Sequence, residues 1–268
     1  MREFSNRLKK IVIKIGSSSI THENGAVNIE RIEELAKEIS NIQDKGISVV
    51  LVSSGAIACG AKQLGMEKRP RDTIGKQATS AVGQVALMNT YNRAFGEYGY
   101  RVGQVLLTKM IETDEQMSGN ARNTFDQLMK MEVVPIVNEN DTISTFEIMF
   151  GDNDTLSAVV ARLIDAELLI LLSDIDGLYT DDPNKNPDAE LIREVNIIDD
   201  KLISMAKGSD SSVGTGGMAT KIKACTMCME KGIDVVISNS DDLKNIRRIV
   251  KGEEVGTIFK GWFIRNSK

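Results

Sequence analysis

The stretch KIVIKIGSSS, residues 10–19, joins a run of mostly apolar residues directly to a glycine and three serines. Its first part, residues 10–15, lacks the alternation of a half-exposed strand and is typical of a strand buried on both faces. A second such run, ISVVLV at residues 47–52, leads into the small, polar sequence SSGA at residues 53–56. Each run therefore predicts a buried strand that ends in a turn of small residues.

Segments with helical and with strand-like periodicity alternate along most of the chain. Apolar spacing predicts helices at residues 28–44, 55–64, 74–97, about 120–131, 154–164, 218–231 and 241–250. Further strands are predicted at residues 102–107, 133–137, 167–172, 234–237 and 257–264, and turns at residues 180–187. Continuous apolar strands separated by helices indicate an α/β protein with a mainly parallel sheet covered on both faces.

The composition excludes several classes of protein. The 268 residues are 41% hydrophobic, which is enough for one large α/β domain or two small ones with a core. Basic residues number 33 against 38 acidic ones, and the resulting net charge of −5 argues against a nucleic-acid partner. The most basic stretch, residues 62–71, is interrupted by Leu64 and Met66 and predicts a solvated loop.

Neither a membrane segment nor an oxidising environment is predicted. The first residues contain no apolar targeting region, so no signal peptide is expected. The longest apolar run, residues 168–172, is far too short to cross a bilayer. Three cysteines do not make a disulfide framework, so a cytoplasmic location is expected. Cys225 and Cys228, a C-x-x-C pair in a predicted helix, are expected to be partly buried thiols, with zinc binding or redox chemistry as the alternative.

Small and hydrogen-bonding residues follow four of the predicted strands. They are KIGSSS at residues 14–19, SSGAIACG at residues 53–60, NEND at residues 138–141 and SDIDG at residues 173–177. Ligands of parallel α/β sheets bind where the carboxyl ends of the strands meet. The turns at residues 16–19 and 53–55 can present backbone N–H groups to an anion, although each turn alone could be a tight strand-to-helix connection.

A glycine cluster, GTGGMATK at residues 214–221, opens a predicted helix. Glycines let a backbone approach phosphate oxygens closely, and Lys221 lies one helical turn further on, within reach of the same oxygens. The sequence contains neither a Walker A loop nor a G-x-G-x-x-G fingerprint, so the glycine cluster is not one of the common nucleotide-binding motifs. The preceding residues 209–213 are expected to be a mobile segment that closes over a nucleotide, or a plain surface loop.

Together these segments resemble the amino acid kinase family. The residues that carry the resemblance are KIGSS at 14–18, SSGAIACG at 53–60, VNEND at 137–141, FGDND at 150–154, SD with GLYT between 173 and 180, and GTGGMATK at 214–221. They occur in the family's order along the whole chain. The resemblance implies a three-layer αβα sandwich with a mainly parallel central sheet of about eight strands. It also implies a single domain over residues 1–268, with a substrate-binding half to about residue 165 and a nucleotide-binding half from about residue 166.

The resemblance also implies a reaction, in which ATP phosphorylates the side-chain carboxylate of L-glutamate to L-glutamyl 5-phosphate, the first step of proline biosynthesis. NEND followed by FGDND is the part of the match that points to glutamate. Mg²⁺ would accompany ATP, and proline inhibition and a homodimer or homotetramer are further family expectations. The C-terminal PUA domain of many relatives is expected to be absent, because the chain ends at Lys268. The alternatives are another carboxylate or carbamate kinase, such as an acetylglutamate kinase, and a nucleotide-binding sensor without turnover.

The family motifs imply roles for three charged residues. Lys14 would contact the transferred phosphoryl group, Lys221 would contact the ATP phosphates on the leaving side, and Asp154 would hold both ammonium groups. Lys14 could instead be a surface lysine, and Asp154 an N-cap. Backbone N–H groups at Gly16 and Gly55 would meet the phosphoryl group. The ATP-binding set that the family implies is Lys14, Ser173, Asp174, Thr215, Gly216, Gly217, Met218, Ala219, Thr220 and Lys221, with no side chain assigned to a metal.

The substrate itself explains which catalytic groups are not needed. The glutamate side chain has an unperturbed pKa of about 4.3, is ionised at pH 7 and needs no general base. The lone histidine, His22, lies in the polar sequence THENG and is expected to be structural or exposed. A buried substrate ammonium would need a carboxylate partner, for which Asp141 is the candidate unless NEND is an ordinary polar turn. Ser54, Asn138 and Asn153 are expected to complete this substrate site.

Overall fold

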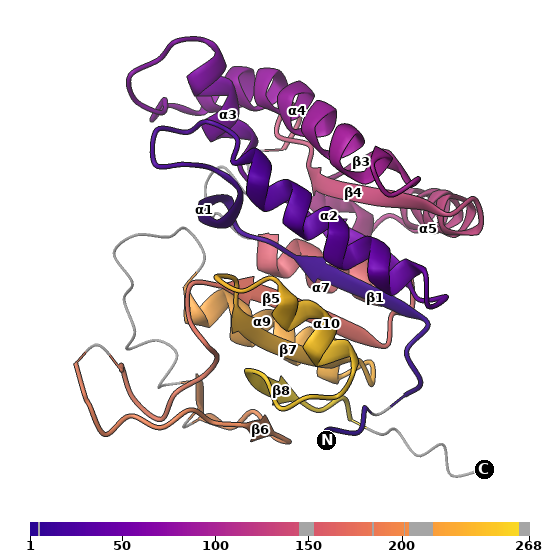
Figure 1. The fold of residues 1–268 in the computed structure, drawn as a ribbon, viewed down its shortest axis with the longest axis vertical. Helices are drawn as coiled ribbons and strands as arrows, with labels where there is room; N and C mark the ends of the chain where they lie inside the picture. Colours follow the sequence, from indigo (N-terminus) through magenta and orange to yellow (C-terminus); the bar gives the residue numbers. More distant parts are fainter. Residues whose placement is uncertain (5, 145–152, 184, 201, 204–216, 263–268) are drawn as a thin grey trace.

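The sequence KIVIK, residues 10–14, forms a strand in the middle of an eight-stranded sheet (Figure 1). The computed structural model describes residues 1–4, 6–144, 153–183, 185–200, 202–203 and 217–262. The strand order in the sheet is β3-β4-β2-β1-β5-β7-β8-β6. The strands are β1 Lys10–Lys14, β2 Ser48–Val52, β3 Arg101–Leu107, β4 Val133–Glu139, β5 Leu168–Ser173, β6 Glu194–Val195, β7 Asp234–Asn239 and β8 Thr257–Phe259.

The sheet is mainly parallel, as the apolar runs predicted. Among the described strands every neighbouring pair is parallel except β7 and β8, which run antiparallel. The last residue of β1, Lys14, stands in register with Val52 of β2 and Leu171 of β5. This register places the carboxyl ends of the three central strands side by side, at one edge of the sheet.

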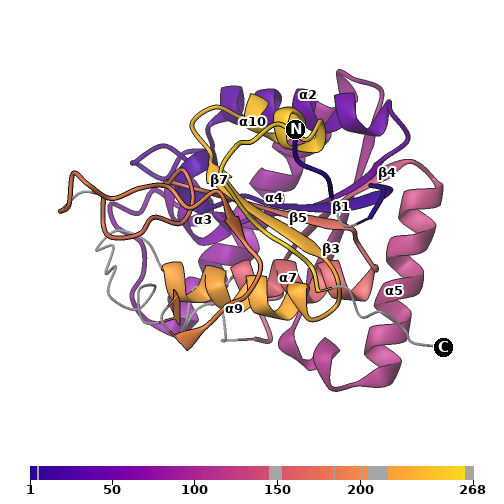
Figure 2. The same ribbon diagram turned by 90° about the horizontal axis from the view of Figure 1, so that it is seen from below.

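Helices cover both faces of the sheet (Figure 2), which makes the three-layer αβα sandwich. Helices α2, α4 and α10 pack on one face and α5, α7 and α9 on the other. The helices are α1 Ser17–Ile20, α2 Ile29–Gln43, α3 Ala56–Gln63, α4 Thr73–Gly96, the 3-10 helix η1 Lys109–Glu112, α5 Glu115–Lys130, α7 Asn153–Leu163, α9 Met218–Met229 and α10 Lys244–Val250.

The two faces of each central strand supply two separate cores. Ile11 and Ile13 of β1 point into the core beneath α2, α4 and α10, whereas Val12 points into the core beneath α5, α7 and α9. All three side chains are fully buried. Because neighbouring residues of a strand face opposite sides, a strand between two helical layers must be apolar throughout. This explains why the central strands show no alternation in the sequence.

Several predicted boundaries differ from the observed ones. Helix α5 begins about five residues before the predicted start at residue 120, because Asp114 caps it by accepting a hydrogen bond from the Met117 N–H. Strand β8 ends at Phe259 rather than at residue 264, and residues 263–264 lie outside the described part. Residues 17–20, predicted as part of a turn, form the one-turn helix α1. Short elements escape periodicity arguments because they hold too few residues to show a period.

The structure bears on the membrane segment and on the cysteine pair considered in the sequence. No helix among the described residues is long and apolar enough to cross a membrane. Cys225 and Cys228 are fully buried free thiols, more deeply placed than the predicted partly buried pair. Burial raises the pKa of the Cys228 thiol to about 12, so its reactive thiolate form is disfavoured.

Candidate active site

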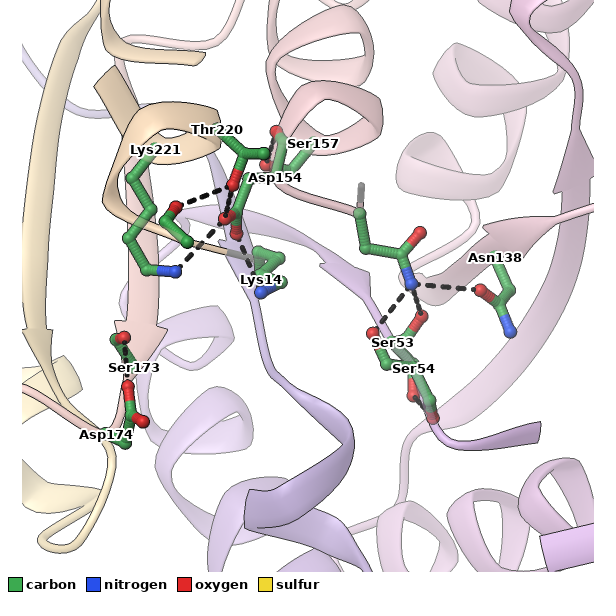
Figure 3. A network of polar contacts seen from close by, with 12 residues as sticks. Lys14, Ser53, Ser54, Asn138, Asp154, Ser157, Ser173, Asp174, Thr220 and Lys221 are labelled. Atoms are coloured by element: carbon green, nitrogen blue, oxygen red, sulfur yellow. Dashed lines mark hydrogen bonds and ion pairs between the residues drawn. The ribbon is translucent and has the colours of Figure 1, made fainter. Parts of the chain in front are cut away.

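The residues predicted to bind phosphate and substrate gather at the carboxyl edge of the central strands (Figure 3). Lys14 ends β1, Ser53 and Ser54 follow β2, Asn138 lies near the end of β4, and Ser173 ends β5. Strand register fixes these positions relative to one another, so the turn residues converge although they are far apart in sequence. The convergence is what the parallel-sheet prediction required.

A buried cluster of one carboxylate and two ammonium groups lies at this edge. The Lys14 Nζ is 2.7 Å from Oδ1 of Asp154, and the Lys221 Nζ is 3.1 Å from Oδ2. The side chains are 9%, 1% and 6% exposed for Lys14, Asp154 and Lys221. Each oxygen of the carboxylate therefore receives one lysine, as Figure 3 shows, and the cluster carries a net charge of +1 in a water-poor place.

The charge state of Asp154 follows from these contacts. Burial by itself would raise the pKa of this carboxyl, but Lys14 and then Lys221 outweigh the burial and lower the pKa to about 2. The carboxylate is therefore ionised at neutral pH. An ionised Asp154 can hold both ammonium groups in fixed places.

Two helix starts position the cluster from the same side of the sheet. Asp154 is the second residue of α7, and Lys221 lies in the first turn of α9. The Thr220 hydroxyl donates to Oδ2 of Asp154 at 2.9 Å, and the Ser157 hydroxyl donates to the Asp154 carbonyl at 2.6 Å. The Asp154 carboxylate thus lies in the first turn of α7, where its negative charge also complements the positive end of the helix dipole.

Two glycines shape the turns that follow β1 and β2. Gly55 precedes α3 with a φ of +94°, a conformation that favours glycine, and a Cβ there would lie 3.3 Å from the Thr21 methyl group. Gly16 precedes α1 in an extended conformation, and a Cβ on it would meet nothing closer than the Ser18 hydroxyl at 3.9 Å. The space beside Gly16 is therefore open to an incoming group.

A second polar network begins at the residue before Asp154. The Asn153 amide donates to the Ser54 hydroxyl at 2.6 Å, to the Ser53 carbonyl at 3.0 Å and to the Asn138 side-chain oxygen at 3.3 Å. Asn138 and Asn153 are each 2% exposed. Because Asn153 and Asp154 are consecutive in α7, this network is contiguous with the lysine cluster.

Asp141 is buried and only half paired. It is 5% exposed, and the Ser80 hydroxyl donates to its Oδ2, while its Oδ1 has no hydrogen-bond partner among the described residues. Burial raises the pKa of this carboxyl, and the Ser80 hydrogen bond acts in the opposite direction. A buried carboxylate with an unused oxygen is suited to receive a cation from a ligand.

Two site residues were missed by the sequence analysis. Ser80 contacts Asp141, and the Gln84 side-chain oxygen accepts a hydrogen bond of 3.1 Å from the Asn138 amide. Both lie on α4 and both are buried. Their spacing of four residues places them on one helix face. The only signal for Ser80 and Gln84 in the sequence is their helical spacing. Polar residues with this spacing in a long helix usually indicate its solvent-exposed face.

The predicted nucleotide side is described in part. Ser173 donates its hydroxyl to Asp174 at 2.9 Å, and Gly217 precedes α9, where its carbonyl accepts the Thr220 hydroxyl at 2.8 Å. Met218 and Ala219 form the first turn of α9 together with Thr220 and Lys221. Thr215 and Gly216 lie outside the described residues.

The fold and this arrangement of lysines at the sheet edge agree with the match to a family model. The model of the Amino acid kinase family matches residues 9–239, and the chain belongs to this family. Two solved structures share the fold. The UMP kinase from Ureaplasma parvum has a TM-score of 0.63 and 18% identity, and the match covers 95% of this chain and all of that one. The isopentenyl phosphate kinase of T. acidophilum has a TM-score of 0.62 and 21% identity, and the match covers 94% of this chain and all of that one.

Among relatives of known name, the similarity extends to glutamate 5-kinases. The glutamate 5-kinase of Clostridium perfringens (strain 13 / Type A) is 48% identical over 263 residues, which cover 97% of this chain and 98% of the relative. The glutamate 5-kinase of Carboxydothermus hydrogenoformans is 48% identical over 260 residues, which cover 97% of this chain and 70% of the relative. Such identity over nearly the whole chain is far above that of the UMP and isopentenyl phosphate kinases.

Proposed function

We propose that this chain is an ATP-dependent glutamate 5-kinase, which converts L-glutamate and ATP to L-glutamyl 5-phosphate and ADP and so starts proline biosynthesis. The observation that carries the proposal is the buried cluster of Lys14, Asp154 and Lys221 at the strand ends, in a chain 48% identical to glutamate 5-kinases. It lies next to the amide and hydroxyl groups of the second network. A phosphate site and a polar substrate site thus adjoin.

The task of the site is to bring a carboxylate to a polyphosphate. The nucleophile is ionised already, so positive charge and positioning have to supply the catalysis. An ammonium group has three N–H donors, and among the described residues Lys14 pairs only with Asp154. Its other donors are available to the oxygens of the moving phosphoryl group. In a site with little water this charge acts more strongly than it would in bulk solvent.

The two lysines would serve the two ends of the transfer. Lys14 ends β1, two residues before Gly16, and it would contact the phosphoryl group and the incoming carboxylate. Lys221 belongs to α9 and would neutralise the charge that develops on the leaving ADP. Asp154 would keep both ammonium groups at fixed places rather than react itself.

Mg²⁺ would enter the site with the nucleotide. The described residues contain no group of three or more His, Cys, Asp or Glu side chains that could hold a metal ion. The buried carboxylate of Asp154 is occupied by two lysines. This donor set fits an ion that is bound mainly by phosphate oxygens and water, as Mg²⁺ usually is. When bound, Mg²⁺ would neutralise charge on the β- and γ-phosphates.

Trapping of the acyl phosphate product tests the proposed reaction. The protein, ATP and Mg²⁺ are incubated with hydroxylamine and with L-glutamate or N-acetyl-L-glutamate, and the hydroxamate formed is measured. The expected result is hydroxamate from L-glutamate only, because the buried Asp141 suits a free α-ammonium. Hydroxamate from N-acetyl-L-glutamate alone would assign the chain to the other substrate, and tight ATP binding without product from either acid would point to a sensor.

The proposal also includes how the protein is regulated, how it assembles and where it is located. Inhibition by proline, a dimeric or tetrameric state and a cytoplasmic location are all proposed on the family resemblance. Free cysteines at positions 59, 225 and 228 agree with a reducing compartment. Light scattering of the purified chain and assays with added proline test the first two: a monomer, or a rate that proline does not change, would refute the respective part.

A further inference from the structure

One face of α4 holds the turn that follows β4. The Gln84 side-chain oxygen accepts from the Asn138 amide at 3.1 Å, the Ser80 hydroxyl donates to Asp141, and the Gln77 amide donates to the Thr142 carbonyl at 3.3 Å. The three α4 residues are spaced by three and four positions, which is one helix face. The helix therefore contacts the segment 138–142 at three successive points.

The middle contact is the one that faces a charged group. Ser80 is 5% exposed and its hydroxyl occupies one oxygen of the Asp141 carboxylate. The other oxygen, Oδ1, is buried and has no hydrogen-bond partner in the part of the chain that the structure describes. Among the described residues no lysine, arginine or histidine forms an ion pair with Asp141. A buried carboxylate that lacks a cation is costly to the free protein, and such a cost is usually kept for a function.

We propose that Ser80 is a positioning residue for substrate selection: its hydroxyl fixes the Asp141 carboxylate so that Oδ1 can receive the α-ammonium group of L-glutamate. This inference rests on the proposed function. Without the hydroxyl, the carboxylate could turn about its last side-chain bond, whose torsional preference is broad. Ser80 would thus set the direction of the ammonium contact without touching the substrate.

The backbone of α4 is held firmly enough for this task. Gly83 packs directly against α3, since a Cβ on it would lie 1.8 Å from the Ala56 carbonyl oxygen. Gly60 of α3 packs equally closely on α4, where a Cβ would lie 1.7 Å from the Thr79 carbonyl oxygen. Ser80 follows Thr79 and precedes Gly83 by one turn, so its hydroxyl projects from the most closely packed part of the helix.

The proposed role predicts which kinetic constant changes. The α-ammonium does not take part in phosphoryl transfer, so its contact contributes equally to the bound substrate and to the transition state. Loss of the Ser80 hydroxyl should raise the KM for glutamate about tenfold, as expected for a hydrogen bond to a charged group. The kcat and the KM for ATP should stay unchanged.

The experiment compares three variants of the full chain. Ser80→Ala removes the hydroxyl, Ser80→Thr keeps it and should recover most of the glutamate affinity, and Ser40→Ala is the matched control. Ser40 is a buried helical serine on α2 whose hydroxyl has no hydrogen-bond partner within the described ranges, so its removal deletes the same atom away from the site. An unchanged glutamate KM in Ser80→Ala, or an equal rise in Ser40→Ala, would overturn the proposal.

A double-mutant cycle tests whether Ser80 acts through Asp141. The value of kcat/KM for glutamate is measured for Ser80→Ala, Asp141→Asn and the double variant. If Ser80 works by orienting the carboxylate, its replacement should have little effect once Asp141 is asparagine. Additive losses would contradict the coupling. The two claims fail in different experiments. Wild-type protein that forms no glutamyl hydroxamate would refute the proposed function, whatever the Ser80 variants show. An active wild type with additive losses would refute only the role of Ser80.

Discussion

At the scale of single residues, Asp154 joins the two lysines that are proposed to bind the phosphates. Its carboxylate is 1% exposed and contacts Lys14 and Lys221 through separate oxygens. Removing the carboxylate would leave two buried ammonium groups facing each other without compensation, which is more costly than losing an exposed ion pair. The same residue therefore matters for stability and for the position of the catalytic charges.

Replacing Asp154 by asparagine should lower stability in a pH-dependent way. At pH 7 the expected loss is about 3–5 kcal/mol, as for other broken buried ion pairs. The pKa of Asp154 is lowered in the folded protein from 3.8 to about 2, so its stabilising effect is present above the unfolded value and is lost as pH falls through the folded value. The difference between wild type and Asp154→Asn in urea unfolding should therefore shrink between about pH 4 and pH 2.

A control for this prediction is Asp165→Asn, which removes the charge of an exposed pair with Arg122. Its effect on the free energy of unfolding should stay within about 1 kcal/mol. If Asp154→Asn cost no more than this control, or if its cost did not change with pH, the buried ion-pair cluster would not have the importance given to it.

Replacing Lys221 by alanine should mainly lower turnover. The contact of Lys221 with the leaving phosphate is expected to strengthen as charge moves onto it, so kcat should fall by roughly a hundredfold or more, with a small change in the glutamate KM. Lys223→Ala is the matched control, because this lysine lies two residues further along α9 and is exposed. A Lys221→Ala enzyme with an unchanged kcat would remove this lysine from the transfer step.

At the scale of elements, α4 connects the proposed substrate residues in the segment 138–142 to helix α3. Its side chains hold the turn at residues 138–142, and its backbone packs on α3, which begins directly after Gly55. The close approach of the two helices depends on Gly60 and Gly83. These glycines therefore set the distance between α3, which follows the proposed phosphate-binding turn, and α4, which holds the proposed substrate residues.

Gly83→Ala should destabilise the protein strongly, whereas Gly96→Ala should not. A methyl group on Gly83 would lie 1.8 Å from the Ala56 carbonyl oxygen, so the helices must separate, at a cost of about 3 kcal/mol or more. A methyl group on Gly96, at the end of the same helix, meets nothing within 4 Å and should raise helix stability by up to about 1 kcal/mol. Thermal unfolding of both variants gives the comparison, and equal melting temperatures would refute the packing argument.

At the scale of the whole molecule, both cores extend across the proposed boundary between the substrate and nucleotide halves. The core beneath α2, α4 and α10 contains Ile13 of β1 and Val236 of β7, and the core on the other face contains Val12 and Val235. Strand β1 also pairs directly with β5, the first strand of the second half. The division near residue 165 is therefore proposed to be functional, with the two halves folding as one domain.

A single cooperative unfolding transition is expected as a consequence. Far-UV circular dichroism reports on all helices, whereas fluorescence of the lone tryptophan, Trp262, reports on the second half only. The two signals should change at the same urea concentration. Separate midpoints would show that the halves unfold independently and would refute the single-domain prediction.

Much of the fold could be predicted because its signals are local. The runs at residues 10–15 and 47–52 are apolar throughout, and such runs specify doubly buried strands whatever the rest of the chain does. Short or capped elements were harder: the start of α5 depends on the Asp114 cap, and the polar residues after it gave no period. The antiparallel pairing of β8 with β7 had no signal in the sequence either, because strand direction depends on the path of the connecting chain.

The sequence by itself determined where most strands and turns lie along the chain. Its motifs indicated the family, the phosphoryl transfer and the residues Lys14, Asp154 and Lys221. Only the tertiary structure decided that each oxygen of Asp154 takes one lysine, and that Ser80 and Gln84 hold Asp141 and Asn138. The physical reason is the range of the interactions. Periodicity and turn chemistry act between neighbouring residues, whereas these contacts join residues that come together only when helices pack against the edge of a finished sheet.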